Sequence, residues 1–170
     1  MIWREVIEGP RMRFLVLSRK EAREVAPQEP YIVIAIADRD GEHADLADSP
    51  HCLAVLRLRF DDTETTDFGG YPMTRKHALK IVRFVREYRE PAQLIVCQCE
   101  QGISRSAAVA AALSSWIQKE DARFFRLYQP NRHVYRLILD VAYRSDLHSS
   151  VNKKNAQLIE SFKQIGTSEE

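Results

Sequence analysis

The sequence predicts an α/β fold with a mainly parallel central sheet of about four to five strands flanked by helices. Four short apolar segments, rich in β-branched residues, have the length and composition of buried strands. Segments with helical periodicity separate them, and this alternation is typical of a parallel sheet with right-handed crossovers. The strands are expected at Arg13–Ser18, Tyr31–Ile36, Cys52–Phe60 and Leu94–Cys97.

Two helices are expected among these strands. Ser18 is placed to cap a short helix over Arg19–Val25, which two prolines then stop. A longer helix is expected over Met73–Tyr88, with Thr74 as its cap, because its apolar residues recur at helical spacing. The polar segment Asp38–Pro50, between the second and third strands, is expected to be a surface loop.

Two more helices are expected beyond the helix that follows the last predicted strand. Asn131 follows a proline and is expected to cap an amphipathic helix. A separate final helix is expected to begin at Ser150. Its apolar stripe, expected to dock on the domain or on a partner, consists of Val151, Leu158, Ile159, Phe162 and Ile165.

Size and composition limit the classes of function. With 170 residues, the chain is long enough for a single domain, expected to span residues 1–170. Its 25 Lys and Arg against 24 Asp and Glu give a net charge of +1, so no overall field favours nucleic acid. No apolar run approaches the roughly 20 residues that span a bilayer, so no membrane partner is expected. Three cysteines make no disulfide framework and fit the cytoplasm.

The segment that indicates a function is Gln93–Leu113. It begins with an apolar strand and ends with the alanine-rich helix pattern of Ala107–Leu113, both expected to be buried. Between them lies the loop Cys99–Ser106. A strand that turns through a compact loop into a helix directs several backbone N–H groups at one spot. Unpaired donors and the helix dipole together favour an anion there.

The side chains of this loop suit nucleophilic attack on a bound phosphate. A Cys99 thiol that faces converging N–H groups and a guanidinium is expected to be activated toward the thiolate. Arg105 offers a planar fork that fits two phosphate oxygens, and Gly102 permits a close approach of the backbone. Ser106 is expected to donate a hydrogen bond to the sulfur. The alternative is a buried structural cysteine before an ordinary helix.

The spacing Cys-x5-Arg, with Gly102 inside it and Ser106 after it, resembles the signature of the dual-specificity branch of the cysteine-based protein phosphatases. The resemblance implies a dual-specificity phosphatase-like fold and hydrolysis without metal or other cofactor. It also implies that phosphate is bound by the backbone from Glu100 to Arg105, that is, by Glu100, Gln101, Gly102, Ile103, Ser104 and Arg105. One position departs from the family pattern, because Gln98 stands where these enzymes usually have histidine.

Phosphoryl transfer from an ester also needs an acid to protonate the leaving oxygen. Phe60-Asp61-Asp62 follows a predicted strand and resembles the general-acid loop of several dual-specificity-like phosphatases, which implies that Asp62 is the acid. Asp61 and Asp67 are the alternatives, and all three carboxylates are solvated loop residues if the resemblance fails here. Farther along, Phe68 and Tyr71 are candidates to flank an aromatic phosphoester, or else simply pack the loop.

The phosphate loop contains Glu100 and no lysine, which argues against a highly charged head group. Phosphotyrosine on proteins is therefore the favoured substrate, with phosphoserine or phosphothreonine left open. Two alternatives are a phosphate-binding module with little turnover and a phosphatase for a non-protein phosphoester. Cys97 and Cys52 are candidates to trap an oxidised Cys99 as a disulfide, although buried strand cysteines with no redox role are favoured.

Overall fold

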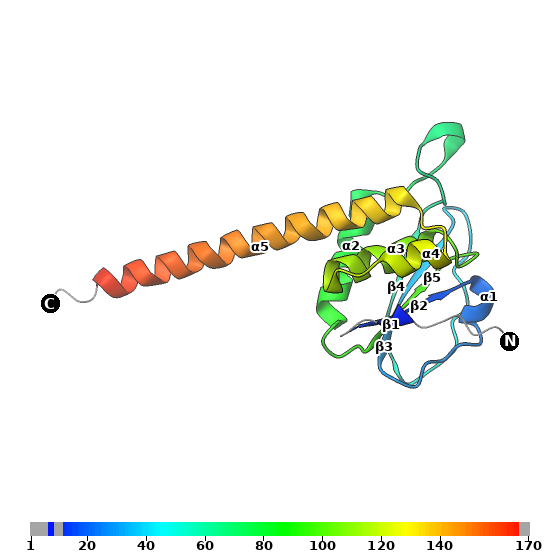
Figure 1. The fold of residues 1–170 in the computed structure, drawn as a ribbon, viewed down its shortest axis with the longest axis horizontal. Coiled ribbons are helices and arrows are strands. Elements are labelled where there is room, and N and C mark those ends of the chain that lie inside the picture. Colours follow the sequence, from blue (N-terminus) through cyan, green and yellow to red (C-terminus); the bar gives the residue numbers. More distant parts are fainter. Residues whose placement is uncertain (1–6, 9–11, 167–170) are drawn as a thin grey trace.

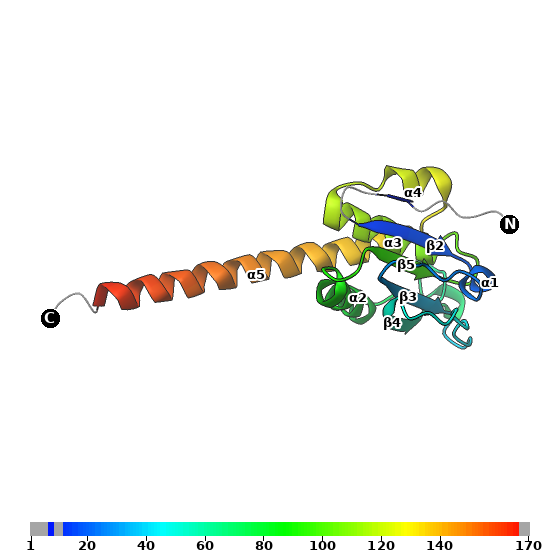
Figure 2. The same ribbon diagram turned by 90° about the horizontal axis from the view of Figure 1, so that it is seen from below.

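The central feature of the fold is a five-stranded sheet with the order β1-β2-β5-β3-β4 (Figures 1 and 2). The computed structural model describes the backbone of residues 7–8 and 12–166 and the side chains of residues 12–161. The strands β2, β5, β3 and β4 are mutually parallel, and β1 pairs antiparallel with β2. Their bounds are β1 Ile7–Glu8, β2 Arg13–Leu17, β3 Tyr31–Ala37, β4 Cys52–Arg59 and β5 Leu94–Gln98. The predicted α/β architecture is thus confirmed, with β1 as an additional short strand.

The burial of each strand follows its position in the sheet. All seven residues of β3 and all five of β5 are buried, as expected for central strands covered on both faces. At the outer edge, β4 alternates between exposed and less exposed residues up to Leu58. Every second residue of β4 therefore faces solvent, and these residues include Arg57 and Arg59.

Helices cover one face of the sheet much more heavily than the other. The larger core cluster joins β3 and β5 to α2 Arg75–Tyr88, α3 Arg105–Gln118, α4 Ala122–Leu127 and the first part of α5 Arg132–Gly166. On the opposite face a smaller cluster packs beneath the short helix α1 Arg19–Ala22 and the loop that follows β3. The predicted caps are confirmed: Ser18 caps α1, Thr74 caps α2, and the Asn131 Oδ1 accepts from the Val134 N–H.

Helix α3 lies in the middle of the structure and is buried almost entirely around its circumference. Eleven of its fourteen residues are buried, and five of these eleven are alanine. Small side chains let neighbouring elements approach the helix closely. The start of α3, where the candidate phosphate loop ends, is therefore held rigidly against the sheet.

The C-terminal part of the chain differs from the prediction. The prediction of a separate helix starting at Ser150 was wrong, because α5 runs without interruption from Arg132 to Gly166. No glycine or proline interrupts this stretch before Gly166, and Ser150 donates its hydroxyl to the Asp146 carbonyl within the helix instead of capping a new one.

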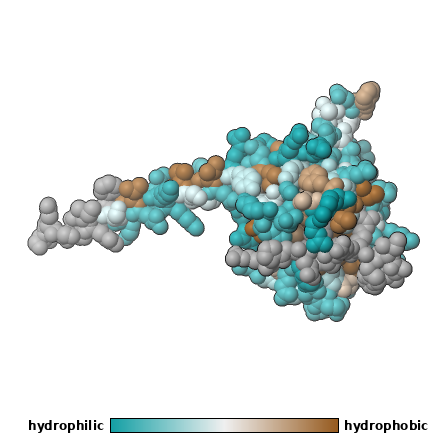
Figure 3. All heavy atoms as spheres, viewed as in Figure 1, coloured by the Kyte–Doolittle hydropathy of each residue, from teal (hydrophilic) through white to brown (hydrophobic). Residues whose placement is uncertain are grey.

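Most of the distal part of α5 projects away from the sheet (Figures 1 and 3). Every described side chain from Leu147 to Ser161 is exposed. The apolar stripe therefore does not dock on the domain: Val151, Leu158 and Ile159 are between 53% and 58% exposed. The side chains of Phe162 and Ile165 lie outside the described ones. Across residues 7–8 and 12–166, no helix is both long enough and apolar enough to cross a membrane.

Candidate active site

The candidate phosphate loop joins the end of β5 to the start of α3. Cys99 directly follows β5, and its N–H donates to the Leu17 carbonyl at 3.2 Å, which extends the pairing with β2 by one residue. The Cys99 side chain is only 2% exposed, and its Sγ lies 3.0 Å from the Ser106 Oγ. The predicted nucleophile and the predicted hydroxyl donor are therefore in contact.

The loop is held by hydrogen bonds on its outer side. Its carbonyls at Glu100, Ile103 and Ser104 accept from the N–H groups of Arg19, Gln129 and Asn131 at 3.0, 3.2 and 3.3 Å. A trans peptide unit points its N–H opposite to its C=O. The N–H groups of the residues that follow these carbonyls, Gln101, Ser104 and Arg105, are therefore directed to the inner side of the loop.

Glycine is required at one position of the loop. Gly102 has a φ of +64°, in the left-handed region that other residues rarely adopt. Around it, Gln101 and Ile103 are exposed while Gly102 itself is buried. This turn lets successive N–H groups face the same side, which is the arrangement of an anion-binding nest.

The guanidinium of Arg105 is buried and firmly oriented. The residue is 4% exposed, and its Nη1 donates to the Phe60 carbonyl and to the Asp38 Oδ1, both at 2.7 Å. The buried Nε of Arg105 has no hydrogen-bond partner among the described residues. A buried donor without an acceptor costs about 1–3 kcal/mol, so this edge of the guanidinium favours an incoming oxyanion.

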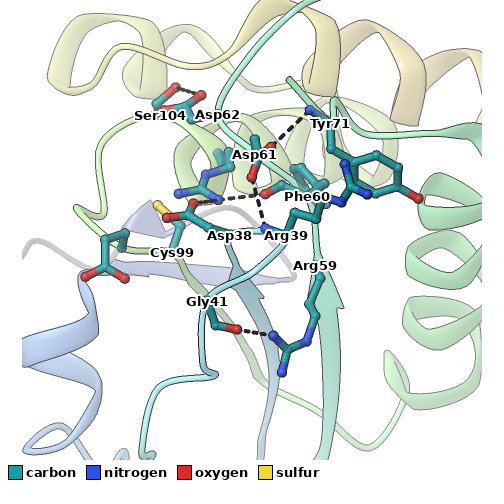
Figure 4. A network of polar contacts seen from close by, with 12 residues as sticks. Asp38, Arg39, Gly41, Arg59, Phe60, Asp61, Asp62, Tyr71, Cys99 and Ser104 are labelled. Atoms are coloured by element: carbon teal, nitrogen blue, oxygen red, sulfur yellow. Dashed lines mark hydrogen bonds and ion pairs between the residues drawn. The ribbon is translucent and has the colours of Figure 1, made fainter. Parts of the chain in front are cut away.

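Asp62 reaches the phosphate loop from the segment after β4. Its Oδ1 accepts from the Ser104 Oγ at 2.8 Å and from the Asn131 Nδ2 at 2.9 Å. Figure 4 shows the contact with Ser104. The residue as a whole is exposed. The structure thus brings the predicted acid to the same loop as Cys99 and Arg105.

The two alternative acids lie elsewhere. The Asp61 carboxylate accepts from the backbone N–H groups of Arg39 and Tyr71 at 2.9 and 3.0 Å, and it closes the neck of the 61–71 loop (Figure 4). Asp67 belongs to the short 3₁₀ helix η1 Asp67–Gly69 in that loop, which protrudes from the molecule (Figure 1). Phe68 in η1 is fully exposed and touches no part of the phosphate loop that would let it flank a substrate.

Two contributors to the site were missed by sequence reasoning. Asp38 was assigned to a surface loop, yet it pairs with Arg105. It directly follows β3, so the rule that functional groups gather beyond the carboxyl ends of parallel strands was a signal that pointed to it. Asn131 was predicted only as a helix cap, and its contact with Asp62 was not anticipated.

Gln98 occupies the position where the dual-specificity phosphatases, whose signature the loop resembles, usually have histidine. It is buried, and its Nε2 donates to the Cys99 carbonyl at 2.7 Å. Its Oε1 has no hydrogen-bond partner among the described residues. Gln98 therefore fixes the first peptide unit of the loop through an amide that carries no charge.

The other two cysteines are poorly placed to react with Cys99. Cys52 starts β4 in register with Tyr31, which in turn is in register with Leu94, five residues before Cys99. At about 3.3 Å per residue it lies about 16 Å away along the sheet, so it cannot form a disulfide with Cys99. Cys97 is fully enclosed, and burial raises the pKa of its thiol far above its usual range. All three cysteines are free thiols.

Comparisons at the level of sequence do not identify the chain: no protein-family model and no curated protein matches it. Solved structures do match. The human tyrosine phosphatase-like serine/threonine/tyrosine-interacting protein has a TM-score of 0.57 and 16% identity, over 85% of this chain and 98% of its own. A variant of human DUSP28 has a TM-score of 0.56 and 17% identity, over 84% and 97%. A mouse putative dual specificity phosphatase, complexed with zinc tungstate, has a TM-score of 0.51 and 16% identity, over 83% and 87%.

The chain has the fold of the dual-specificity phosphatases. This confirms the fold that the resemblance implied, whereas the roles of individual residues stay predictions at such low sequence identity. Among the described residues, no group of three or more His, Cys, Asp or Glu side chains is placed to hold a metal ion. What the site is able to do chemically follows from Cys99, Arg105, Ser106 and Asp62.

Proposed function

We propose that the chain is a phosphatase that hydrolyses phosphate monoesters through a cysteinyl-phosphate intermediate, with phosphotyrosine on proteins as its preferred substrate. One observation carries the proposal. The Cys99 Sγ, the unpaired Nε of the buried Arg105 and the inward N–H groups belong to a single loop. A phosphate held by these donors has a nucleophile beneath it and positive charge around its oxygens.

In the first step the Cys99 thiolate attacks phosphorus, and the bond between phosphorus and the ester oxygen breaks. Arg105 and the loop N–H groups stabilise the charge on the three non-bridging oxygens. Phe60 and Asp38 orient the guanidinium for this task through its Nη1. The protonated Asp62 carboxyl gives its proton to the leaving oxygen, and Ser104 and Asn131 hold its other oxygen.

In the second step water attacks the phosphorus of the cysteinyl phosphate, and the sulfur–phosphorus bond breaks. Asp62, now a carboxylate, accepts the proton of that water. The Ser106 hydroxyl, 3.0 Å from the Cys99 Sγ, donates a hydrogen bond to the departing sulfur. The products are inorganic phosphate and the regenerated thiolate, so no redox partner or cofactor enters the balance.

Phosphotyrosine is favoured for two reasons. Cys99 is only 2% exposed, so a phosphate that it attacks must reach below the surface, and a tyrosyl phosphate projects farther from its backbone than a seryl phosphate. In addition, the only charged side chain of the loop before Arg105 is Glu100, whose carboxylate pairs with Arg19 at 3.1 Å. The phosphate loop thus offers no lysine for the neighbouring phosphates of a polyphosphorylated head group.

A second candidate function is phosphate binding with little turnover. Gln98, a neutral amide in place of the usual histidine, favours it because it adds no positive charge next to the Cys99 peptide unit. The fold itself does not discriminate, because it is shared by a mouse putative dual specificity phosphatase and by a human tyrosine phosphatase-like interacting protein. The hydrogen bond between Ser104 and Asp62 favours turnover, because a module that only binds phosphate needs no acid in contact with its loop.

Hydrolysis of p-nitrophenyl phosphate by the purified protein separates these functions. We expect turnover that is lost in Cys99→Ser, while binding of inorganic phosphate to that variant is retained. The rate is expected to be the same with and without a chelator. Phosphate binding without turnover in the wild type would establish the binding module instead, and a requirement for metal would contradict the scheme.

The remaining attributes of this phosphatase follow from the same reasoning. We propose that residues 1–170 form one phosphatase domain whose partners are phosphorylated substrates. Three free thiols and a mechanism that needs a reduced Cys99 fit the cytoplasm. Fractionation of cells that express the tagged protein tests this location.

A further inference from the structure

A second charged feature lies at the outer edge of β4. It is a surface pocket of about 480 Å³ whose lining includes six basic side chains and no acidic one. We call it the basic pocket, defined by Arg39, His43, Arg57, Arg59, His77 and Lys80. Four of these residues are arginine or lysine, so the pocket concentrates positive charge in a chain whose net charge is only +1.

The sheet topology explains why these residues meet. β4 is an edge strand, and its exposed parity places Arg57 and Arg59 on one side of that edge. The loop after β3 supplies Arg39 and His43, and α2 supplies the remaining two from the other side. The pocket therefore wraps around an open sheet edge, whose backbone groups are available to an extended peptide.

The charges of the basic pocket are not neutralised within the described part of the protein. The Arg57 Nη1 donates to the Ala44 carbonyl at 3.2 Å, and the Arg59 Nη1 donates to the Gly41 carbonyl (Figure 4). Arg39 lies over the Tyr71 ring, with 5.2 Å between its guanidinium carbon and the ring centroid. Carbonyls and an aromatic ring orient these side chains, but none of them brings a compensating full charge.

Several other arginines of the chain form ion pairs, in contrast to those of the basic pocket. Ion pairs join Arg13 to Glu29, Arg75 to Asp140 and Arg86 to Asp146. Within residues 12–161, no residue of the basic pocket has such a partner. Uncompensated like charges at close range repel one another, so their grouping favours an anionic ligand.

The two histidines of the basic pocket both have lowered pKa values, and neighbouring positive charge contributes to each. Burial and then the neighbouring Arg59, Arg57 and Arg19 lower the pKa of His43. Burial and then Lys80 lower the pKa of His77. The His43 Nδ1 is buried and has no hydrogen-bond partner among the described residues.

The basic pocket adjoins the candidate active site. Arg39 follows Asp38, whose carboxylate binds Arg105, and the Arg39 N–H donates to Asp61, which precedes the proposed acid Asp62. Consecutive Cα atoms are 3.8 Å apart, so the Arg39 backbone lies roughly 10 Å from the Arg105 guanidinium. Figure 4 shows Asp38, Arg39 and Asp61 between Cys99 and the Tyr71 side of the site.

We propose that the basic pocket binds a second anionic group of the substrate, a carboxylate or phosphate on the same peptide as the phosphate that Cys99 attacks. This rests on the proposed phosphatase function and extends it to a specificity site. Two to three residues of an extended peptide span about 7–10 Å, which is comparable to the distance from the Arg105 guanidinium to the Arg39 backbone, where the basic pocket begins. A peptide fits better than a compact head group, because the positive charge lies beside the reacting phosphate and along a strand edge.

The test compares one phosphotyrosine peptide with flanking glutamates, the same peptide with flanking alanines, and one whose second anion is a phosphothreonine. The pocket variant is Arg39→Ala/Lys80→Ala, because neither charged group holds a backbone carbonyl in the described structure. The control variant, Lys153→Ala/Lys154→Ala, removes the same charge from the distal part of α5. The small ester p-nitrophenyl phosphate reports on the phosphate loop alone.

The wild type and the control variant are expected to hydrolyse both doubly anionic peptides with a kcat/KM roughly 3- to 30-fold above that of the alanine peptide, given the usual strength of exposed ion pairs. The pocket variant is expected to lose this preference and keep its rate on p-nitrophenyl phosphate. Comparing the glutamate and phosphothreonine peptides distinguishes the two sources of the anion. High salt is expected to reduce the preference of the wild type.

Failure of the inference is separable from failure of the proposed function. Hydrolysis of p-nitrophenyl phosphate without any preference for the doubly anionic peptides would overturn the inference alone. If no ester is hydrolysed, anisotropy of the labelled peptides bound to wild type and pocket variant tests the basic pocket directly, and equal affinities overturn it. Loss of binding to RNA or anionic vesicles in the pocket variant, with peptide binding unchanged, would also overturn it.

Discussion

Replacing Asn131 by serine separates two tasks of this side chain. Its Oδ1 accepts from the Val134 N–H at the start of α5, and its Nδ2 donates to the Asp62 Oδ1 at 2.9 Å. Serine retains an acceptor for the helix cap but has no amide donor that reaches Asp62. Alanine loses both contacts, so the pair Asn131→Ser and Asn131→Ala distinguishes an effect on stability from an effect on the position of Asp62, the proposed acid.

The sizes of the two effects follow from the contacts. Loss of a helix cap costs about 1 kcal/mol, which lowers the melting temperature by about 2–4 °C for a domain of this size. We expect this loss in Asn131→Ala and little of it in Asn131→Ser. Both variants lose one of the two hydrogen bonds that hold Asp62, since Ser104 still donates. If about 1–2 kcal/mol of this bond acts in the transition state, kcat falls about 5- to 30-fold.

The assay uses esters that need the acid to different extents. With phosphotyrosine, whose leaving group requires a proton, the full loss is expected. With p-nitrophenyl phosphate, whose leaving group departs readily as the anion, the loss is expected to be smaller. The decisive comparison places Asn131→Ser in an Asp62→Asn background, where a residue that acts only through Asp62 has no further effect.

Two results would refute this reasoning. One is full activity of Asn131→Ser on phosphotyrosine, which would mean that Ser104 alone positions the acid or that Asp62 has no such role. The other is an equal loss in the presence and absence of the Asp62 carboxyl, which would show that Asn131 acts through the loop, since its N–H donates to the Ser104 carbonyl. Melting curves of both variants check the cap.

Three further predictions concern the acid, the arginine and the core. Asp62→Ala is expected to lose roughly 10²–10⁴ of the rate in steady-state kinetics, whereas Asp67→Ala keeps it; the reverse would reassign the acid. Asp38→Asn removes a negative charge 2.7 Å from Arg105, so inorganic phosphate should inhibit the enzyme about 2- to 5-fold more strongly. An unchanged inhibition constant would show that the charge of Asp38 does not influence the bound phosphate. Phe124→Ala, which empties a fully buried position against Phe14, should cost about 3–5 kcal/mol in denaturant unfolding, with the more exposed Phe125→Ala costing much less.

Local features of the fold were predictable from the sequence because their causes are local. Ser18 and Thr74 cap the helices that directly follow them, and the apolar run of β5 is buried as its composition indicates. The turn from strand to helix at Cys99–Ser106 was also predictable, since the spacing of Cys99, Gly102 and Arg105 depends on neighbouring residues. The long α5 was not, because serine both starts helices and tolerates their interior, and the choice at Ser150 depends on the preceding helix.

Sequence reasoning brought Asp62 to the loop of Cys99 through a family resemblance, but it did not supply other contacts between distant segments. Asp38 and Arg105 are far apart in the chain, and their pairing exists only because β3 lies beside β5. The contact of Asn131 with Asp62 needs the start of α5 to lie over the end of the segment after β4. Likewise, the basic pocket assembles a loop, an edge strand and a helix, and none of these is conspicuous in the sequence by itself.

The length of α5 has a consequence for how its hydrogen bonds survive in solution. Its 35 residues extend about 52 Å, but the buried side chains Val134, Ile138, Val141 and Ala142 all lie in its first third. Docking of this part supplies the nucleus, and the turns from Leu147 to Ser161, whose side chains are all exposed, form by propagation along the helix. Amide protons should therefore exchange slowly near Ile138 and progressively faster beyond Leu147, so that protection varies strongly within one continuous helix.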